Sequence, residues 1–164
     1  MKSITFYGKL GIGKTIKVDD ADFEWLNKYK WYLSGRKDKL YAITHLENKK
    51  RISMHRLILK MTDSKILVDH EDGDGLNNQR GNIRIANKSQ NAANRQKATS
   101  ATSKYLGVHI HYAYGGKYKY IYASCMKDGK NYNIKCSSEI EAALKYNELA
   151  IMHHGEFARL NIIE

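Results

Sequence analysis

The chain of 164 residues has no proline and only two cysteines, Cys125 and Cys136. Its turns must therefore come from glycine, asparagine and aspartate. Two cysteines without CxxC spacing exclude a disulfide framework and a cysteine-based zinc site. No apolar run reaches the length of a membrane span, and no basic N-terminus leads into an apolar stretch with a small-residue cleavage site. We therefore expect a cytoplasmic protein without a membrane partner.

The charge balance is strongly positive. Lysine and arginine number 28 against 17 aspartates and glutamates, which gives a net charge of +11 at pH 7. Hydrophobic residues make up 42% of the chain, enough for a folded core, so wholesale disorder is excluded. The positive charge favours a polyanionic partner such as nucleic acid. The alternative is a basic, solvated surface with no such partner.

The chain is predicted to divide near its middle. Residues 97–102 are small or polar and carry no apolar periodicity, which is typical of a linker. The expected organisation is one domain over residues 1–96 and a second over residues 103–164. The alternative is a surface loop at this point within a single domain.

The N-terminal half mixes short strands and short helices, so the fold class is α+β. Strands are predicted at residues 15–18, 31–33 and 40–43, and a further short strand near the N-terminus. Acidic residues at positions 19–22 indicate the start of a helix, where the helix dipole favours negative charge. A second helix is expected after His55.

The C-terminal half alternates apolar and polar residues in three runs, at 108–111, 121–126 and 131–136. This predicts a three-stranded antiparallel sheet, with a hairpin turn at Asp128-Gly129. A helix follows, opened by a capping box at Ser138. The helix face expected to be buried consists of Ile140, Ala143, Leu144, Asn147, Ala150 and Ile151. One face of the sheet then packs on this single helix, and the other stays polar and open.

Two motif matches are rejected on their context. Residues 8–15 match the letters of a phosphate-binding loop, but β-branched residues follow where such a loop needs a helix. Residues 69–74 are acidic but lack the ligand spacing of a helix-loop-helix calcium site. We interpret residues 8–15 as a glycine-rich hairpin turn, and we assign neither nucleotide hydrolysis nor calcium binding.

The strongest signal is a series of four segments, His55-Arg56-Leu57, Val68-Asp69-His70, Asn77 to Arg84 (NNQRGNIR) and Ser89 to Arg95 (SQNAANR). Their joint spacing resembles the His-Asn-His (HNH) nucleases, and among them the homing endonucleases of phages and mobile elements. The resemblance covers about residues 1–96. It implies two strands and a helix arranged around one metal ion, a ββα-metal nuclease domain.

The residue types suit hydrolysis of a phosphodiester, which needs an activated water and a cation beside the scissile phosphate. An imidazole titrates near neutrality, so His70 can accept the proton of that water. The resemblance implies that His70 ends the first of these strands and that Asp69 and Asn91 hold the metal. It also implies that Asn82 is a catalytic residue, which orders the loop and holds His70 in place. Carboxylate and amide oxygens suit Mg²⁺ or Mn²⁺. Asn91 stands where the family name has a histidine, which favours magnesium over zinc, and we assign no catalytic role to His55.

Three C-terminal segments, Ser103–Val108, Glu139–Asn147 and His154–Asn161, resemble the plant Apetala and ethylene-response (AP-two) DNA-binding domain over about residues 103–162. The resemblance implies that the open sheet face lies in a DNA major groove. That face is predicted to hold His109, His111, Tyr122, Ser124, Met126, Asn131 and Asn133, several of which can hydrogen-bond base edges. The candidate phosphate contacts are Lys104, Lys117 and Lys119. The plant arginines and tryptophans are missing here, so no sequence preference carries over. The alternative is a solvated face, or one that contacts the nuclease domain.

These features predict a two-domain, metal-dependent endonuclease of the homing type that acts on double-stranded DNA. The resemblance implies 3′-hydroxyl and 5′-phosphate ends, and a phage-encoded enzyme would act in the cytoplasm of its bacterial host. One metal site per chain implies a nick from a monomer or a double-strand break from a dimer. Two alternatives belong to other classes, a catalytically inactive DNA-binding regulator that keeps both folds and a basic RNA-binding protein. For His70 itself, the alternative is a hydrogen-bonded core histidine.

Overall fold

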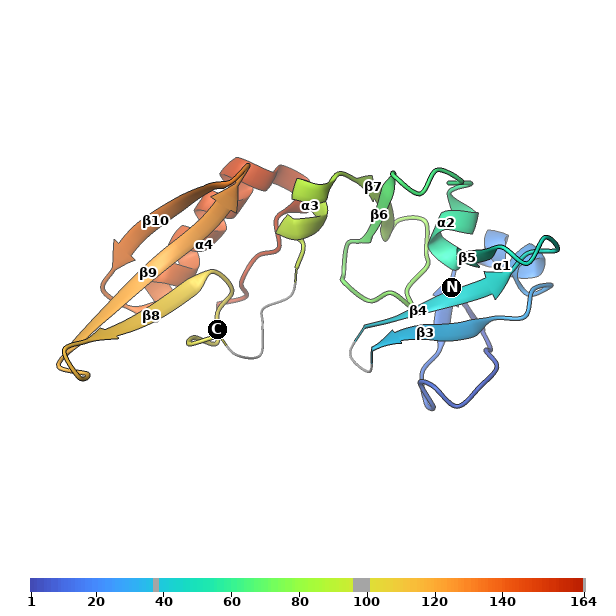
Figure 1. Ribbon diagram of the computed structural model, residues 1–164, viewed down its shortest axis with the longest axis horizontal. Coiled ribbons are helices and arrows are strands. Elements are labelled where there is room, and N and C mark those ends of the chain that lie inside the picture. Colours follow the sequence, from blue (N-terminus) through green and yellow to red (C-terminus); the bar gives the residue numbers. More distant parts are fainter. Residues whose placement is uncertain (37–38, 96–100, 164) are drawn as a thin grey trace. The chain divides into compact units, whose positions relative to one another are not determined.

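The computed structural model describes residues 1–36, 39–95 and 101–163. They fall into two compact units, divided between Asn87 and Lys88 (Figure 1). The predicted linker at residues 97–102 lies largely outside the described residues, so the predicted domain boundaries stay a prediction. No helix in the described ranges is long and apolar enough to cross a membrane.

The first unit is built from short strands and two short helices. Its strands are β1 (Lys2–Ile4), β2 (Ile16–Val18), β3 (Tyr32–Arg36), β4 (Lys39–His45), β5 (Arg51–Ser53), β6 (Leu67–His70) and β7 (Ile83–Ala86). Its helices are α1 (Asp20–Leu26) and α2 (Met54–Ile58). All the pairings are antiparallel: β1 with β2, β4 between β3 and β5, and β6 with β7. This confirms the mixed α and β character expected of this half.

The segment at residues 8–15 connects β1 to β2, as the hairpin interpretation requires. Gly11 and Gly13 have φ angles of 76° and 82°, a left-handed conformation that glycine adopts without strain. Residues 16–18 continue as strand β2 rather than as a helix. The segment therefore lacks the helix N-terminus that a phosphate-binding loop uses.

One hydrophobic core holds the first unit together, and Trp31 lies fully buried in it. The Trp31 indole N–H donates to the carbonyl of Leu26 at 2.8 Å, so its polar atom is satisfied inside the core. Leu76 and Ile83, from the loop after β6 and from β7, belong to the same core. The β6–β7 hairpin is therefore anchored to the rest of the unit by apolar packing.

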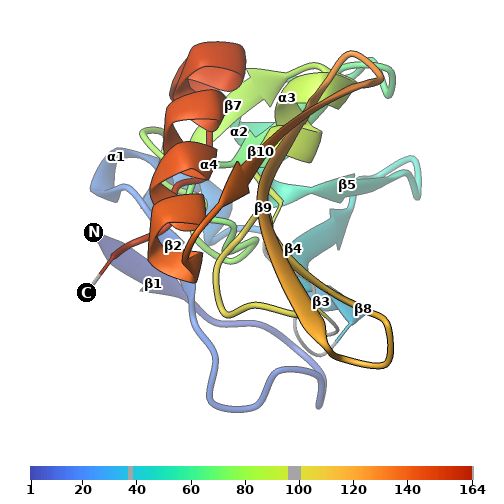
Figure 2. The ribbon, with the colours of Figure 1, turned by 90° about the vertical axis from the view of Figure 1, so that its left-hand side faces the viewer.

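The second unit is a sheet with helices. Its elements are α3 (Lys88–Ala93), β8 (Val108–Ala113), β9 (Tyr118–Lys127), β10 (Lys130–Cys136), α4 (Glu139–His154) and a 3₁₀ turn at Gly155–Phe157. The sheet order is β10-β9-β8, all antiparallel, as the sequence predicted. Figure 2 shows α4 running along one face of this sheet. Helix α3 contacts α4 and the 3₁₀ turn within this unit.

The buried face of α4 differs from the predicted one. Its buried residues are Ala142, Ala143, Tyr146, Leu149 and Ala150. The prediction was right for Ala143 and Ala150 but wrong for Ile140, Leu144 and Ile151, which are about half exposed. The face that meets the sheet combines three alanines with Tyr146 and Leu149. The apolar spacing alone does not distinguish these two neighbouring faces.

The predicted capping box is present in a modified form. The Ser138 hydroxyl accepts a hydrogen bond from the backbone N–H of Glu141 at 3.1 Å. The Glu141 carboxylate accepts from the backbone N–H and the hydroxyl of Ser137, one residue earlier than the usual partner. The helix N-terminus is therefore capped by a three-residue network.

Candidate active site

The β6–β7 hairpin positions the two residues at the centre of the predicted site. Asp69 and His70 are the last residues of β6, where they lie opposite Arg84 and Ile83 of β7. Both are buried, with 7% and 5% of their surfaces exposed. His70 ends the first strand, as the sequence predicted. The pairing with β7 fixes the backbone of both residues.

Arg84 is a site residue that the sequence analysis did not single out. Its Nε and Nη2 lie 3.3 Å from Oδ2 of Asp69, and Nη1 lies 3.7 Å from Glu71. The Asp69 carboxylate is thus compensated by a cation across the hairpin, which limits the cost of burying its charge. The sequence did not indicate this contact, because the long loop between β6 and β7 leaves the register of the two strands open.

Asn82 organises the loop between β6 and β7. Its Oδ1 accepts from the backbone N–H of Asp72 at 3.0 Å, and its Nδ2 donates to Oδ1 of Asp72 at 3.0 Å and to the carbonyl of Asn77 at 2.8 Å. Asn77 Nδ2 in turn donates to Oδ2 of Asp72 at 2.8 Å. The carboxylate of Asp72 and the Asn82 amide together cross-link the loop. A loop-ordering role is what the sequence led us to expect of Asn82, while its part in catalysis stays a prediction.

The rings of His55 and Tyr41 both contact the ring of His70. The imidazole of His55, from α2, lies 4.9 Å from that of His70 between ring centroids, with an interplanar angle of 87°. The ring of Tyr41, from β4, lies 5.8 Å from His70 and 5.9 Å from His55. His55 is buried, with 8% of its surface exposed. The sequence motif contained His55, but nothing in it indicated the contact with His70 or the presence of Tyr41.

Burial keeps both imidazoles neutral. It lowers the pKa of His55 to about 3, with a smaller effect from the neighbouring charges of His70 and Arg56. Burial also lowers the pKa of His70. The side-chain amide of Asn78 and the nearby carboxylates have the opposite, smaller effect, because they favour the protonated form. At neutral pH the His70 imidazole therefore has a lone pair available to accept a proton.

Asn78 is a fully buried polar residue close to His70. Its surface is 0% exposed, and its side-chain amide interacts with the His70 imidazole, whose protonated form it favours. Its backbone N–H donates to the carbonyl of Lys17 at 2.8 Å, so the chain is fixed here. Buried amides are nearly always paired in native proteins. Asn78 is therefore a buried polar neighbour of the candidate base.

An ion pair between the half-exposed Arg80 and the buried Asp22 fastens the loop to α1. Arg80 donates from Nε and Nη2 to both oxygens of Asp22, at 2.7 and 2.8 Å. The backbone N–H of Arg80 also donates to Asp19, at 2.8 Å. The guanidinium of Arg80 holds the pKa of Asp22 below its usual range. Sequence spacing could not show this pair, because the partners are 58 residues apart.

Gly75 brings the loop against the sheet that carries Tyr41. A Cβ at this position would lie 2.3 Å from the carbonyl oxygen of Leu40 and 2.6 Å from Cδ1 of Tyr41. Contacts this short do not occur between real side chains, so only glycine fits. The loop is therefore held at three places, by Arg80, by the network around Asn82 and by this close approach.

The residues present fit a hard cation that keeps most of its water. No three His, Cys, Asp or Glu side chains come together as a metal site in the parts of the chain that the structure describes. Mg²⁺ is commonly held by one or two carboxylates, with waters and substrate phosphates as its other ligands. Asp69 supplies one such carboxylate. Asn91 lies on α3 in the second unit, and its role as the second ligand stays a prediction.

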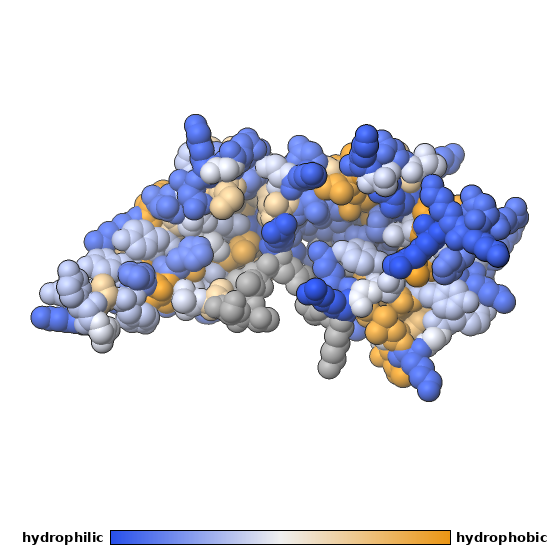
Figure 3. Space-filling model, viewed as in Figure 1, coloured by the Kyte–Doolittle hydropathy of each residue, from blue (hydrophilic) through white to orange (hydrophobic). Residues whose placement is uncertain are grey.

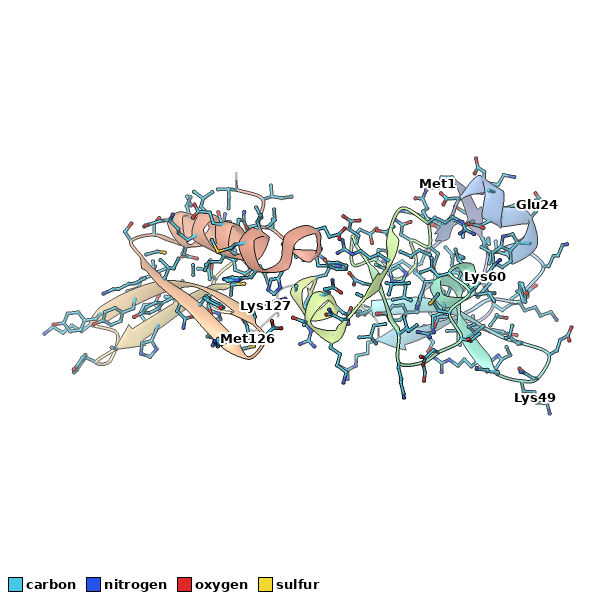
Figure 4. All side chains as sticks on the ribbon, turned by 90° about the horizontal axis from the view of Figure 1, so that it is seen from above. Met1, Glu24, Lys49, Lys60, Met126 and Lys127 are labelled. Carbon is cyan, nitrogen blue, oxygen red and sulfur yellow. The ribbon has the colours of Figure 1, made fainter. Side chains whose placement is uncertain are left out.

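The second unit presents the open face that the alternation predicted. On it, His109 lies opposite Tyr122, and Asn133 lies opposite Ser124. The predicted members His109, His111, Tyr122, Ser124, Met126, Asn131 and Asn133 are all exposed or half-exposed. In Figure 4, α4 lies on one side of the strands and Met126 on the other. Figure 3 looks onto this open face and shows it mostly hydrophilic.

The predicted lysines lie in different settings. The ammonium of Lys117 lies 5.6 Å from the ring centroid of Tyr118, and that of Lys104 lies 4.9 Å from the ring of Tyr105. Lys119 is directed to the helix side instead, with Nζ 3.9 Å from Glu139 of α4. On the open face, Lys135 lies over the ring of Tyr120 at 4.9 Å. The sequence analysis missed these two residues, although the strand alternation includes them.

The chain is 34% identical, over an alignment of 170 positions, to a protein of Acanthamoeba polyphaga mimivirus that bears the name of an uncharacterized HNH endonuclease. The alignment covers 99% of this chain and 83% of that protein, so it extends over both units. No family model and no solved structure matches the chain. These comparisons lend no support to the AP-two resemblance, which stays a prediction.

Proposed function

Because the chain belongs to the HNH endonuclease family, we propose that it is a homing-type enzyme that hydrolyses phosphodiester bonds in double-stranded DNA with a divalent metal. The observation that carries the proposal is the buried Asp69-His70 pair at the end of β6, braced by β7 and by an ordered loop. The net charge of +11 supports a polyanionic substrate. The products expected are a 3′-hydroxyl and a 5′-phosphate.

In this proposal His70 is the general base. Its neutral imidazole takes a proton from the attacking water as the new oxygen–phosphorus bond forms. The bond between phosphorus and O3′ breaks, and the departing O3′ takes up a proton from solvent to give the 3′-hydroxyl. Asp69 and Asn91 would hold Mg²⁺ or Mn²⁺. The metal, when bound, stabilises the negative charge that develops on the phosphate. The cation of Arg84 pairs with Asp69 across the hairpin, with Nη2 3.3 Å from Oδ2.

The second unit is proposed to recognise the DNA. Its open face offers imidazole and amide groups that can hydrogen-bond base edges, and its rings can pack on sugars or thymine methyls. Lys104, Lys117 and Lys119 are proposed to contact phosphates, which would position the protein without specifying sequence. Since Lys119 is paired with Glu139, it must leave that partner to reach a phosphate.

The test of catalysis is conversion of supercoiled plasmid to nicked or linear forms, with Mg²⁺ and with EDTA, followed by mapping of the ends. His70→Ala is expected to lower the cleavage rate by about 10²–10⁴-fold, because general-base help is lost. Binding to duplex DNA should be kept. The matched control is His45→Ala, which removes an exposed imidazole at the end of β4 and should cleave normally.

Absence of cleavage by the wild-type protein under every divalent metal, with tight binding to duplex DNA, would instead identify a DNA-binding regulator. Tighter binding to RNA than to duplex DNA would identify an RNA-binding protein. Asp69→Ala and Asn91→Ala should each raise the Mg²⁺ concentration needed for half-maximal cleavage. An unchanged midpoint in both variants would mean that the ligands are elsewhere.

The recognition proposal has its own test, selection of preferred sites from a randomised duplex library at two salt concentrations. Asn133→Ala should relax the preference at one base position, at a cost of about 1–3 kcal/mol there. Lys117→Ala should weaken all sequences alike and lower the salt dependence by roughly one ion. If Asn131→Ala and Asn133→Ala leave both preference and affinity unchanged, this face does not read the DNA.

A further inference from the structure

His55 is a buried imidazole for which the proposed mechanism has no use. It lies in α2, between the fully buried Met54 and the nearly buried Ile58, so packing fixes its backbone. The carbonyl of His55 accepts a hydrogen bond from the N–H of Leu59 at 3.1 Å. Its ring is therefore presented to His70 from a rigid support.

The imidazole of His55 is not the side chain that would make the fold most stable at this position. Nδ1 of His55 is buried and has no hydrogen-bond partner among the described residues. A buried polar atom without a partner costs free energy, and an apolar side chain of similar size would avoid that cost. Imidazole is also the smallest aromatic ring among the natural side chains, so it offers a flat ring where a larger one would not fit. A small ring at this position therefore comes at a cost to the stability of the fold.

The ring contact explains why this position holds a small ring. The planes of His55 and His70 are 87° apart with centroids at 4.9 Å, so the edge of one ring meets the face of the other. Tyr41 closes the cluster at 5.8 Å from His70. Two rings held by different elements, α2 and β4, thus bound the space in which the His70 imidazole can turn. A larger ring would push against His70, and an aliphatic chain would leave it room to rotate.

We propose that His55 is a positioning residue whose ring fixes the orientation of the His70 imidazole. This inference rests on the proposed function, in which His70 is the base. His55 itself touches neither water nor phosphate in this role. Burial also keeps the pKa of His55 low, so no second positive charge forms beside the base. Because proton transfer needs an aligned lone pair, a base free to turn is expected to lose about 10- to 100-fold in rate.

The test compares three variants of the full-length protein by their kcat, their KM for plasmid DNA and their urea midpoints. His55→Ala removes the ring, His55→Gln keeps much of the volume without a ring, and His55→Phe keeps a ring that is too large. The first two are expected to lower kcat by about 10- to 100-fold with KM unchanged. His55→Phe is expected to recover part of that loss. The control His45→Ala should keep the wild-type kcat.

The outcomes separate the ring contact from a merely structural role. If folded His55→Ala has the wild-type kcat, the inference is wrong; should that variant not fold, the same criterion applies to His55→Gln. An equal loss in His55→Phe and His55→Gln would also overturn it, because ring shape would then not matter. A wild-type protein that fails to cleave DNA with Mg²⁺ overturns the proposed function, and this inference with it. Wild-type cleavage together with full activity of the ringless variants overturns this inference alone.

Discussion

Replacing Arg80 by alanine is expected to loosen the loop that carries Asn82. The Arg80 guanidinium makes two hydrogen bonds of 2.7 and 2.8 Å to the carboxylate of Asp22, on α1. The Asp22 side chain is 4% exposed, whereas that of Arg80 is 53% exposed. The carboxylate is therefore the partner that cannot turn to water when the pair is broken.

The magnitude follows from this asymmetry. Breaking a buried ion pair by removing one partner costs about 3–5 kcal/mol. Here the half-exposed guanidinium is screened by solvent, which reduces its contribution, and Trp25 still donates to Asp22 at 3.0 Å. We expect Arg80→Ala to lower the free energy of unfolding of the first unit by about 2 kcal/mol. The double variant Asp22→Asn/Arg80→Ala has no orphaned charge, and we expect it to be more stable than Arg80→Ala alone.

The assay is urea unfolding followed by tryptophan fluorescence. Trp25 and Trp31 are the two tryptophans of the chain, and both lie in the first unit, so the signal reports on that unit. The matched control is Lys145→Ala, which breaks an exposed pair with Glu148 in the second unit. This control should leave the fluorescence midpoint unchanged.

The dependence on pH provides a second check. The hydrogen bonds from Arg80 lower the pKa of Asp22 in the folded protein. The pair therefore stabilises the fold fully above the unfolded-state pKa, about 3.9, and this stabilisation is lost as the pH falls through the lower folded-state value. The difference between wild type and Arg80→Ala should shrink at low pH. Equal midpoints at pH 7, or a double variant less stable than Arg80→Ala, would refute the reasoning.

Three further predictions concern the second unit. Gly107→Ala should destabilise it by about 2 kcal/mol or more, because the φ of Gly107 is +69° and a Cβ there would lie 1.9 Å from the ring of Tyr146; a normal melting temperature by circular dichroism would contradict this. Cys125 and Cys136 are buried, and burial raises the pKa of the Cys125 thiol. Both thiols should therefore react with a thiol reagent only as this unit unfolds, and rapid labelling of the native protein would disprove this prediction. Ser138→Ala should cost about 1 kcal/mol of stability through loss of the helix cap, measured by the urea midpoint of cysteine labelling, with Ser138→Asn as the variant that should restore it.

The elements best predicted from the sequence are those set by local pattern. The strands at residues 108–113, 118–127 and 130–136 follow from alternation, and the cap at Ser138 from a four-residue motif. Each of these features depends on residues only a few positions apart, so no knowledge of packing was needed.

The features that could not be predicted are contacts between distant segments. The orientation of α4, which buries Tyr146 and leaves Leu144 half exposed, depends on how the helix packs on the sheet. The contact of His55 with His70 depends on how α2 packs beside the hairpin, 15 residues further along the chain. A sequence pattern shows which residues are candidates for such contacts, but tertiary packing decides which of them meet.

The contacts made by the loop explain how so small a unit can hold a base in place. A unit of this size has a limited core, so its free energy of folding is modest. The loop between β6 and β7 is nevertheless held in place by three contacts. These are the ion pair of Arg80 with the buried Asp22, the amide–carboxylate network at Asn82 and the close backbone approach at Gly75. Each contact restrains a different part of the same loop, and the rings of His55 and Tyr41 restrain His70 itself. Since catalysis by a general base depends on orientation more than on global stability, restraint concentrated on this loop serves the proposed reaction better than a larger core would.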